Sequence, residues 1–203
     1  MADKLVIEIF KNKNAEEFTK AISSPESKAE VGSAAAYSAA LAAALCARAA
    51  AVTKTEAQEN ERVDYILRNA DKLREYMVHL IDEDVKSRGP LAKALKEGDA
   101  RHIEAARQPA ACIANEIVNM MGQCLELMDE LAAICPAEAV ALLGEGAELA
   151  MASVRACRIY LVAMADKCSD ETYRFVTRRE NELSLAHCTE VYNSISEKTE
   201  AEI

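Results

Sequence analysis

The feature that most constrains the fold is an alanine-rich run from Lys28 to Thr53, which contains no proline. Alanine has the highest helix propensity of the amino acids, so the run predicts a long helix. A helix coated with methyl groups lets other helices approach its backbone closely. It buries little apolar area by itself, however, and is stable only when larger side chains from its neighbours surround it. The run therefore predicts the central, surrounded helix of a bundle.

The same run is long enough to cross a lipid bilayer, so a membrane span is the alternative interpretation. Arg48, Ser33 and Ser38 interrupt the run, and alanine is a poor residue for a membrane span. We therefore expect a core helix, and we expect no membrane as a partner.

The composition also favours an all-α fold. The 203 residues include only 6 glycines and 4 prolines, and aromatic residues make up 4%. A β protein of this length needs more turn residues and more β-branched or aromatic side chains. The net charge of −10 argues against nucleic acid as a partner, because phosphate contacts need a basic face.

The cysteines and histidines give no sign of a metal site. The 7 cysteines form no Cys-x-x-Cys pair, which is typical of buried thiols in a reducing compartment. His79, His102 and His187 lack the spacing of metal-binding motifs, so no metal is expected. The start of the chain lacks the basic flank and long apolar core of a signal peptide, so we expect a cytoplasmic protein.

Apolar residues that recur every three or four positions predict further helices. Asn14 and Glu17 have the spacing of a capping box and open a short first helix. Arg88-Gly89-Pro90 is expected to kink or break the third helix, and Pro109 to kink or restart the fourth. Ser169 is expected to cap the last helix. The expected helices are 14–23, 28–53, 56–87, 100–134, 136–165 and 169–196, with a short separate piece at 91–96.

No linker or low-complexity tract divides the chain. We expect residues 1–203 to form one domain, an antiparallel bundle of five to six long helices with short connections. Residues 1–12 are an N-terminal extension whose apolar run fits a strand or a helix equally well. Gly144 and Gly146 lie inside a helical pattern, so they imply a close helix contact or a backbone approach to a ligand.

Several segments become informative when they are read together. Residues 15–25 read Ala-Glu-Glu-Phe-Thr-Lys-Ala-Ile-Ser-Ser-Pro and lead into Gly32-Ser33, residues 80–87 read Leu-Ile-Asp-Glu-Asp-Val-Lys-Ser, residues 91–96 read Leu-Ala-Lys-Ala-Leu-Lys, and residues 157–161 read Cys-Arg-Ile-Tyr-Leu. In this order and spacing they resemble the cyclodeaminase/cyclohydrolase family of folate one-carbon metabolism, over residues 14–195. That family includes formiminotetrahydrofolate cyclodeaminases and methenyltetrahydrofolate cyclohydrolases.

The resemblance implies a cyclodeaminase-like helical bundle that forms a homodimer and acts on a tetrahydrofolate derivative without a cofactor. It implies a folate site beside the loop that carries Gly32 and Ser33. The polar residues that match the family's motifs are Asp82 and Asp84 of the Leu-Ile-Asp-Glu-Asp segment, the lysine after that helix, Lys96, and the arginine of the Cys-Arg-Ile-Tyr-Leu segment, Arg158.

Opening or closing a methenyl bridge between two folate nitrogens needs a general acid and a general base. Asp82 and Asp84 project about 200° apart on a helix, so they cannot both face one pocket. Asp82 lies next to the apolar stripe of its helix, and we assign catalysis to Asp82 and Lys96. The alternative to a catalytic role is a solvated charge on the helix surface for Asp82 and an ordinary surface lysine for Lys96. Arg158 either clamps a ligand carboxylate or forms an internal salt bridge, and the residues assigned to substrate binding are Gly32, Ser33, Asp84 and Arg158.

Some ligand-facing segments depart from the family pattern. The family's Pro-Gly-Gly-Gly-Ser loop keeps only Gly32-Ser33, two asparagines become Ala156 and Tyr160, and an aromatic-Asn pair becomes Arg88-Gly89. Because these changes spare the helical scaffold, a second hypothesis is a non-catalytic dimeric helical protein that has lost the folate chemistry.

Overall fold

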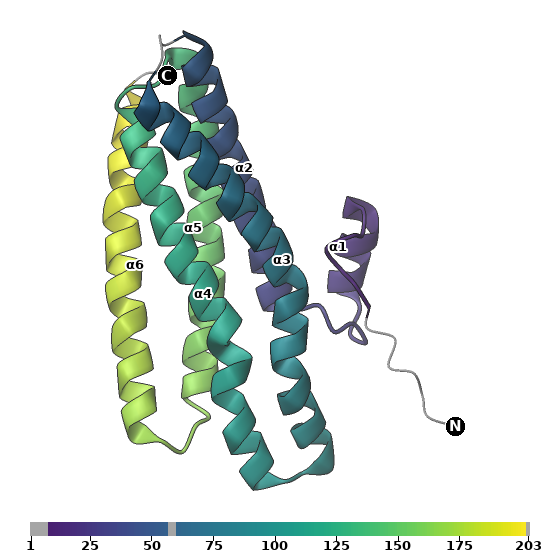
Figure 1. Cartoon of the computed structure of the whole chain (residues 1–203). Helices are drawn as coiled ribbons and strands as arrows, with labels where there is room; N and C mark the ends of the chain where they lie inside the picture. Colours follow the sequence, from purple (N-terminus) through teal and green to yellow (C-terminus); the bar gives the residue numbers. More distant parts are fainter. Residues whose placement is uncertain (1–7, 57–59, 202–203) are drawn as a thin grey trace.

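The computed structural model describes residues 8–56 and 60–201, and these residues form six helices joined by short connections (Figure 1). Successive helices from the second to the sixth run up and down as neighbours, which confirms the predicted all-α antiparallel bundle. The helices are α1 (Ala15–Ser23), α2 (Val31–Glu56), α3 (Glu61–Glu97), α4 (Ala100–Ala132), α5 (Ala137–Ala165) and α6 (Glu171–Glu200).

The alanine-rich run forms α2, which packs against α3, α5 and α4. Its alanines are buried without exposed area at positions such as Ala36, Ala39 and Ala43, and neighbouring helices supply the large side chains, including Met77 and Met121. One face of α2 stays open, because Leu41 is 44% exposed. The helix is therefore central, as the sequence predicts, but it is not surrounded on every side.

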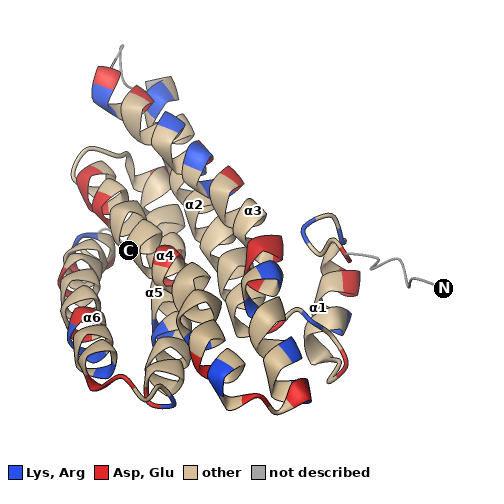
Figure 2. Ribbon diagram, turned by 60° about the horizontal axis from the view of Figure 1, so that its bottom comes forward, with Lys and Arg blue, Asp and Glu red and all other residues tan. Residues whose placement is uncertain are grey.

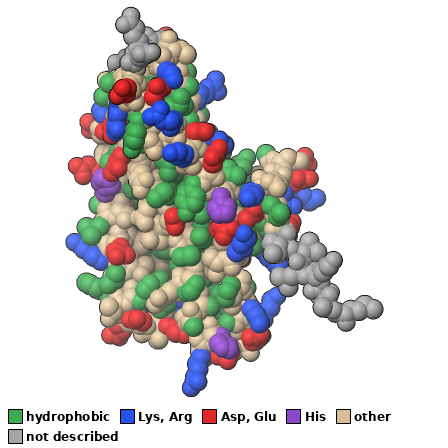
Figure 3. Space-filling model, viewed as in Figure 1, with side chains coloured by type: hydrophobic (Ala, Val, Ile, Leu, Met, Phe, Trp, Pro, Cys, Tyr) green, Lys and Arg blue, Asp and Glu red, His purple; other side chains and the backbone are tan. Residues whose placement is uncertain are grey.

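By length and composition, residues Val31–Thr55 of α2 could cross a membrane. Their packing against three other helices is that of a bundle-core helix. Figure 2 shows α2 with few charged residues, while α3, α4 and α6 carry acidic and basic residues along their length. On the face seen in Figure 3, acidic and basic side chains are interspersed with apolar ones.

Local sequence signals set most of the helix ends. Asn14 caps α1 through the predicted capping box with Glu17, and Gly98, with a φ of 71°, ends α3 in the left-handed conformation that glycine tolerates. The predicted cap of the last helix is wrong by one residue. Asp170 caps α6, whereas the Ser169 hydroxyl donates to Glu104 of α4 at 2.8 Å.

The predicted break at Arg88-Gly89-Pro90 is wrong, because α3 continues through Pro90 to Glu97. A residue before proline normally avoids the helical region, since its Cβ and backbone N–H collide with the proline ring. Gly89 has no Cβ, so the part of this collision that involves a Cβ is absent at Pro90. The fourth helix likewise runs without interruption through Pro109.

The N-terminal extension lies only partly within the described residues, which begin at Glu8. Residues 8–13 are neither helix nor strand. Phe10 is buried with 1% of its area exposed, and the ring of Phe18 on α1 stacks on Tyr37 of α2 at 4.9 Å. These two aromatic residues pack the start of the chain against the bundle.

The two glycines of α5 have different surroundings. A Cβ on Gly146 would lie 2.8 Å from Met128 Cε and 3.4 Å from the carbonyl oxygen of Ala42, whereas a Cβ on Gly144 would make only ordinary contacts with Thr199 at 3.6 Å. Gly146 therefore allows the close approach of α5 to α2 that was one of its two expected roles.

We expect Gly146→Val to lower the free energy of unfolding by about 1–3 kcal/mol, because the added carbons overlap α2 and α4. Gly144→Ala is the matched control on the same helix and should stabilise by up to about 1 kcal/mol, through helix propensity. Urea denaturation followed by circular dichroism measures both. Equal effects of the two substitutions would show that Gly146 is not at a close helix contact.

Candidate functional site

The carboxylate of Asp84 lies at the amino end of α2 with 1% of its area exposed. Its Oδ2 accepts a hydrogen bond from the backbone N–H of Ser33 at 3.0 Å, and the Ser33 hydroxyl lies 3.0 Å from the same oxygen. Asp84 thus caps α2 from α3, and the partial positive charge of the helix amino end stabilises its negative charge.

Gly32 is where the backbone of α2 comes closest to this carboxylate. A Cβ at this position would overlap Asp84 Oδ1. Oδ1 itself is buried without a hydrogen-bond partner, although buried carboxylate oxygens normally have one. Asp84 Oδ1 is therefore a buried acceptor that lacks a hydrogen-bond donor.

Arg88 lies one helical turn after Asp84 and joins α3 to the segment before α2. Its Nη2 donates to Asp84 Oδ2 at 3.0 Å and to the carbonyl oxygen of Lys28 at 2.7 Å, and its Nη1 pairs with Glu30 Oε2 at 2.5 Å. The side chain is 12% exposed, and its Nε is buried without a partner. The cation of this site is therefore Arg88.

Asp84, Arg88 and Glu30 form a charged cluster, and burial together with these charges shifts the pKa values of two side chains on α5. Burial is the main cause that raises the pKa of Tyr160 to about 12, with Arg88 lowering it and Asp84 and Glu30 raising it. Burial, followed by the charge of Asp84, raises the pKa of Cys157 to about 12. Both groups are therefore neutral at pH 7, and the Tyr160 hydroxyl donates to the carbonyl oxygen of Ala110 at 3.3 Å.

Asp82 faces a different part of the molecule from Asp84, as their spacing on the helix predicts. It is 7% exposed, and its Oδ1 accepts hydrogen bonds from the backbone N–H groups of Phe10 at 2.7 Å and Lys11 at 3.3 Å. Asp82 thus holds the N-terminal extension on α3. Its catalytic role stays a prediction.

Lys96 and Arg158 are not joined to this cluster in the described chain. Lys96 is exposed in the last turn of α3, 12 residues beyond Asp84 and hence about 18 Å along the helix axis. Arg158 is half-buried on α5, and its Nε is buried without a partner. Of the predicted site residues, the structure brings together Gly32, Ser33 and Asp84.

Sequence reasoning placed Arg88 and Tyr160 in ligand-facing segments that depart from the family pattern, but it gave neither of them, nor Glu30, a role in the site. One signal was available for Arg88, because an aspartate and an arginine four residues apart on a helix form an ion pair. That signal was hidden by the expectation that the helix ends at Arg88-Gly89-Pro90. Glu30 and Tyr160 join the site only through tertiary packing.

A groove of about 660 Å³ lies beside this cluster, between the segment before α2, the first turns of α2 and α5. Glu30, which pairs with Arg88, also lines the groove. Its other lining residues are mostly small or apolar and include Ile22, Pro25, Ala34, Ser38 and Ala156. The volume of the groove lies within the range of small-molecule sites, and Glu30 is its charged lining residue.

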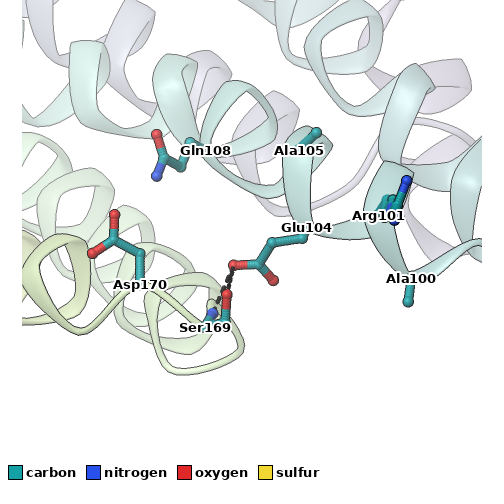
Figure 4. Close-up of a pocket in the computed structure, with 7 residues that line it drawn as sticks. All are labelled: Ala100, Arg101, Glu104, Ala105, Gln108, Ser169 and Asp170. Carbon is teal, nitrogen blue, oxygen red and sulfur yellow. Dashed lines mark hydrogen bonds between the residues drawn. The ribbon is translucent and has the colours of Figure 1, made fainter.

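A second cavity, of about 610 Å³, lies at the end of the bundle between the first turns of α4 and the α5–α6 connection. Figure 4 shows Glu104 accepting the backbone N–H and hydroxyl of Ser169, at 2.6 and 2.8 Å. None of the predicted site residues lines this cavity. Within the described part of the chain, no cluster of three or more histidine, cysteine or acidic side chains could hold a metal ion.

We expect Gly32→Ala to destabilise the protein by about 2 kcal/mol, because the new methyl group overlaps a carboxylate that Ser33 and Arg88 hold in place. Gly122→Ala is the control, since its Cβ would meet only Cys188 Sγ at 3.6 Å. Chemical denaturation measures both. If Gly32→Ala were as stable as Gly122→Ala, the close approach of Gly32 to Asp84 would be wrong.

Tyr160 should contribute to alkaline unfolding. Its folded pKa of about 12 lies above its ordinary value of 10, so the neutral phenol is favoured in the folded state. This contribution is complete below pH 10 and is lost as the pH rises towards about 12. Tyr160→Phe should make the fall in stability across this range shallower and remove one late tyrosinate from the absorbance titration. An unchanged alkaline titration would contradict the assignment.

A search of curated proteins finds no match. Among solved structures, the crystal structure of formiminotetrahydrofolate cyclodeaminase from Thermotoga maritima superposes with a TM-score of 0.87 at 18% identity, covering 94% of this chain and 97% of the other, and so shares the fold. The sequence matches the profile of the formiminotransferase-cyclodeaminase family over residues 14–182. The chain therefore belongs to the formiminotransferase-cyclodeaminase family.

Proposed function

We propose that the chain binds a tetrahydrofolate derivative in the groove beside α2 and catalyses general acid/base chemistry at a C–N bond of its one-carbon unit. The two candidate reactions are those of a formiminotetrahydrofolate cyclodeaminase and a methenyltetrahydrofolate cyclohydrolase. The observation that carries the proposal is the buried Asp84 carboxylate, with one unpartnered oxygen, whose ion-pair partner Arg88 also binds Glu30 at the edge of a groove of small-molecule size.

In this proposal Asp84 is the carboxylate nearest the reacting atoms. Ser33 and Arg88 both bind Oδ2, which leaves Oδ1 as the oxygen without a donor. A carboxylate in this state can take a proton from an attacking nitrogen or water, or stabilise a cationic one-carbon bridge. Tyr160 is protonated at neutral pH and can donate a hydrogen bond.

The remaining assigned residues take more distant roles. Asp82 positions the N-terminal extension through the amides of Phe10 and Lys11. The separation of Lys96 from Asp84 exceeds the reach of a lysine side chain, so a catalytic Lys96 must come from a second copy in the proposed homodimer. Arg158 remains a candidate for binding the ligand's carboxylate. No cofactor enters the proposed reaction.

A second candidate function is a non-catalytic member of the family. The observation in its favour is the Arg88 guanidinium, which already occupies Asp84 and Glu30. A protein in which this pair is permanent would keep the bundle without turning over a folate. The two functions differ in whether folate compounds bind and react.

The deciding assay measures loss of the methenyl-folate absorbance band and release of ammonia from a formimino-folate with purified protein. We expect turnover with one of the two substrates, and we expect Asp84→Asn to reduce it by about 10²-fold or more, the usual contribution of an acid/base group. Asp71→Asn, at an exposed α3 aspartate paired with Arg74, is the matched control.

No turnover above the buffer rate, together with no change in melting temperature at high folate concentration, would support the non-catalytic function instead. A melting-temperature shift without turnover would identify a folate-binding protein and would reject the catalytic part of the proposal alone.

A further inference from the structure

The Arg88 guanidinium fills a preformed set of acceptors. It lies against the Asp84 carboxylate, the carbonyl oxygen of Lys28 and the carboxylate of Glu30. A planar, forked array of N–H donors matches such an arrangement better than a point charge does. These three groups therefore form a receptor for a planar cation, and the chain's own arginine occupies it.

The charges of this receptor explain why it needs a cation. Asp84 and Glu30 are negative and Arg88 is positive, so the cluster carries a net charge of −1 even when Arg88 is in place. Asp84 is buried, and a buried carboxylate that loses its ion-pair partner is strongly destabilised. Arg88 can therefore leave Asp84 only if another cation takes its position.

The contact with Glu30 is the weaker part of the arrangement. The Glu30 side chain is 59% exposed, so solvent and salt screen its attraction to Arg88. The segment 24–30 that Arg88 holds through Lys28 and Glu30 also forms one wall of the groove. If Arg88 moved away, segment 24–30 would lose its contacts with α3, and the Asp84 carboxylate would become accessible at the same time.

We propose that Arg88 is a latch: its side chain is the resident occupant of a planar-cation site formed by Asp84, Glu30 and the Lys28 carbonyl, and a ligand with a guanidinium or amidinium group binds Asp84 by displacing it. The latch keeps segment 24–30 closed against α3. This proposal does not depend on folate turnover, because it concerns the site and the segment whether or not the chain is an enzyme.

The test is hydrogen exchange of the backbone amides in segment 24–30, followed by mass spectrometry. We expect exchange in Arg88→Ala to be about tenfold faster than in the unchanged protein, because the hydrogen bond to the Lys28 carbonyl and the ion pair with Glu30 no longer hold the segment. Methylguanidinium at millimolar concentration should slow the exchange again in Arg88→Ala. Methylammonium, which has the same charge without the planar fork, should do so less.

Two further variants keep the test decisive. Asp84→Asn added to Arg88→Ala should abolish the protection by methylguanidinium, since the receptor has lost its buried charge. Glu30→Gln, which leaves Asp84 and Arg88 in place, removes only the more exposed contact, so it should speed exchange less than Arg88→Ala does, and it serves if Arg88→Ala does not fold. Arg74→Ala, at an exposed α3 arginine, is the matched control and should leave the segment closed.

Exchange in both Arg88→Ala and Glu30→Gln at the rate of the unchanged protein would overturn the latch. Equal protection by methylguanidinium with and without the Asp84 carboxylate would overturn the planar-cation site. Neither result would bear on folate turnover, so failure of the latch and failure of the proposed reaction are distinguishable.

Discussion

The carboxylate of Asp84 at the amino end of α2 is the contact on which the candidate site depends. An alanine helix has almost no side chains with which to satisfy its own first amides, so the cap comes from α3. The negative charge is stable there despite burial, because the helix amino end, Ser33 and Arg88 all stabilise it. The helix that organises the bundle thus also holds a buried carboxylate at its amino end.

Asp84 both caps α2 and carries an oxygen that is free to bind another group. Two of the neighbours of Asp84 bind a single oxygen, and the other oxygen faces Gly32 without a donor. The family's pattern has more glycine in the loop before α2, where this chain carries Lys28 and Glu30 instead. These two residues supply the carbonyl and the carboxylate that hold Arg88. The changes in the loop and after the acidic motif therefore act together, because each supplies one partner of the same ion-pair cluster.

The architecture could be predicted from the sequence because its signals are local. The alanine run, the capping box at Asn14 and the Gly98 turn depend on helix propensity and backbone geometry within a few residues. The continuity of α3 through Pro90 was missed, because proline is a local breaking signal, whereas α3 and α4 both continue past their prolines within the packed bundle. The grouping of Gly32, Ser33 and Asp84 came from the resemblance. The partners of Asp82, the distance of Lys96 and the entry of Arg88 and Tyr160 are set by contacts between distant segments, which periodicity does not encode.

The hydrogen bonds from Phe10 and Lys11 to Asp82 join positions that are 72 and 71 residues apart. Both donors are main-chain amides, so nineteen of the twenty amino acids can make these bonds at either position. The side chain at position 11 can therefore change while the hydrogen bond to Asp82 stays, so a comparison of sequences alone cannot reveal this bond. Proline is the single exception, because it lacks the amide hydrogen, so a proline at position 10 would cut the shorter of the two links without removing any charge.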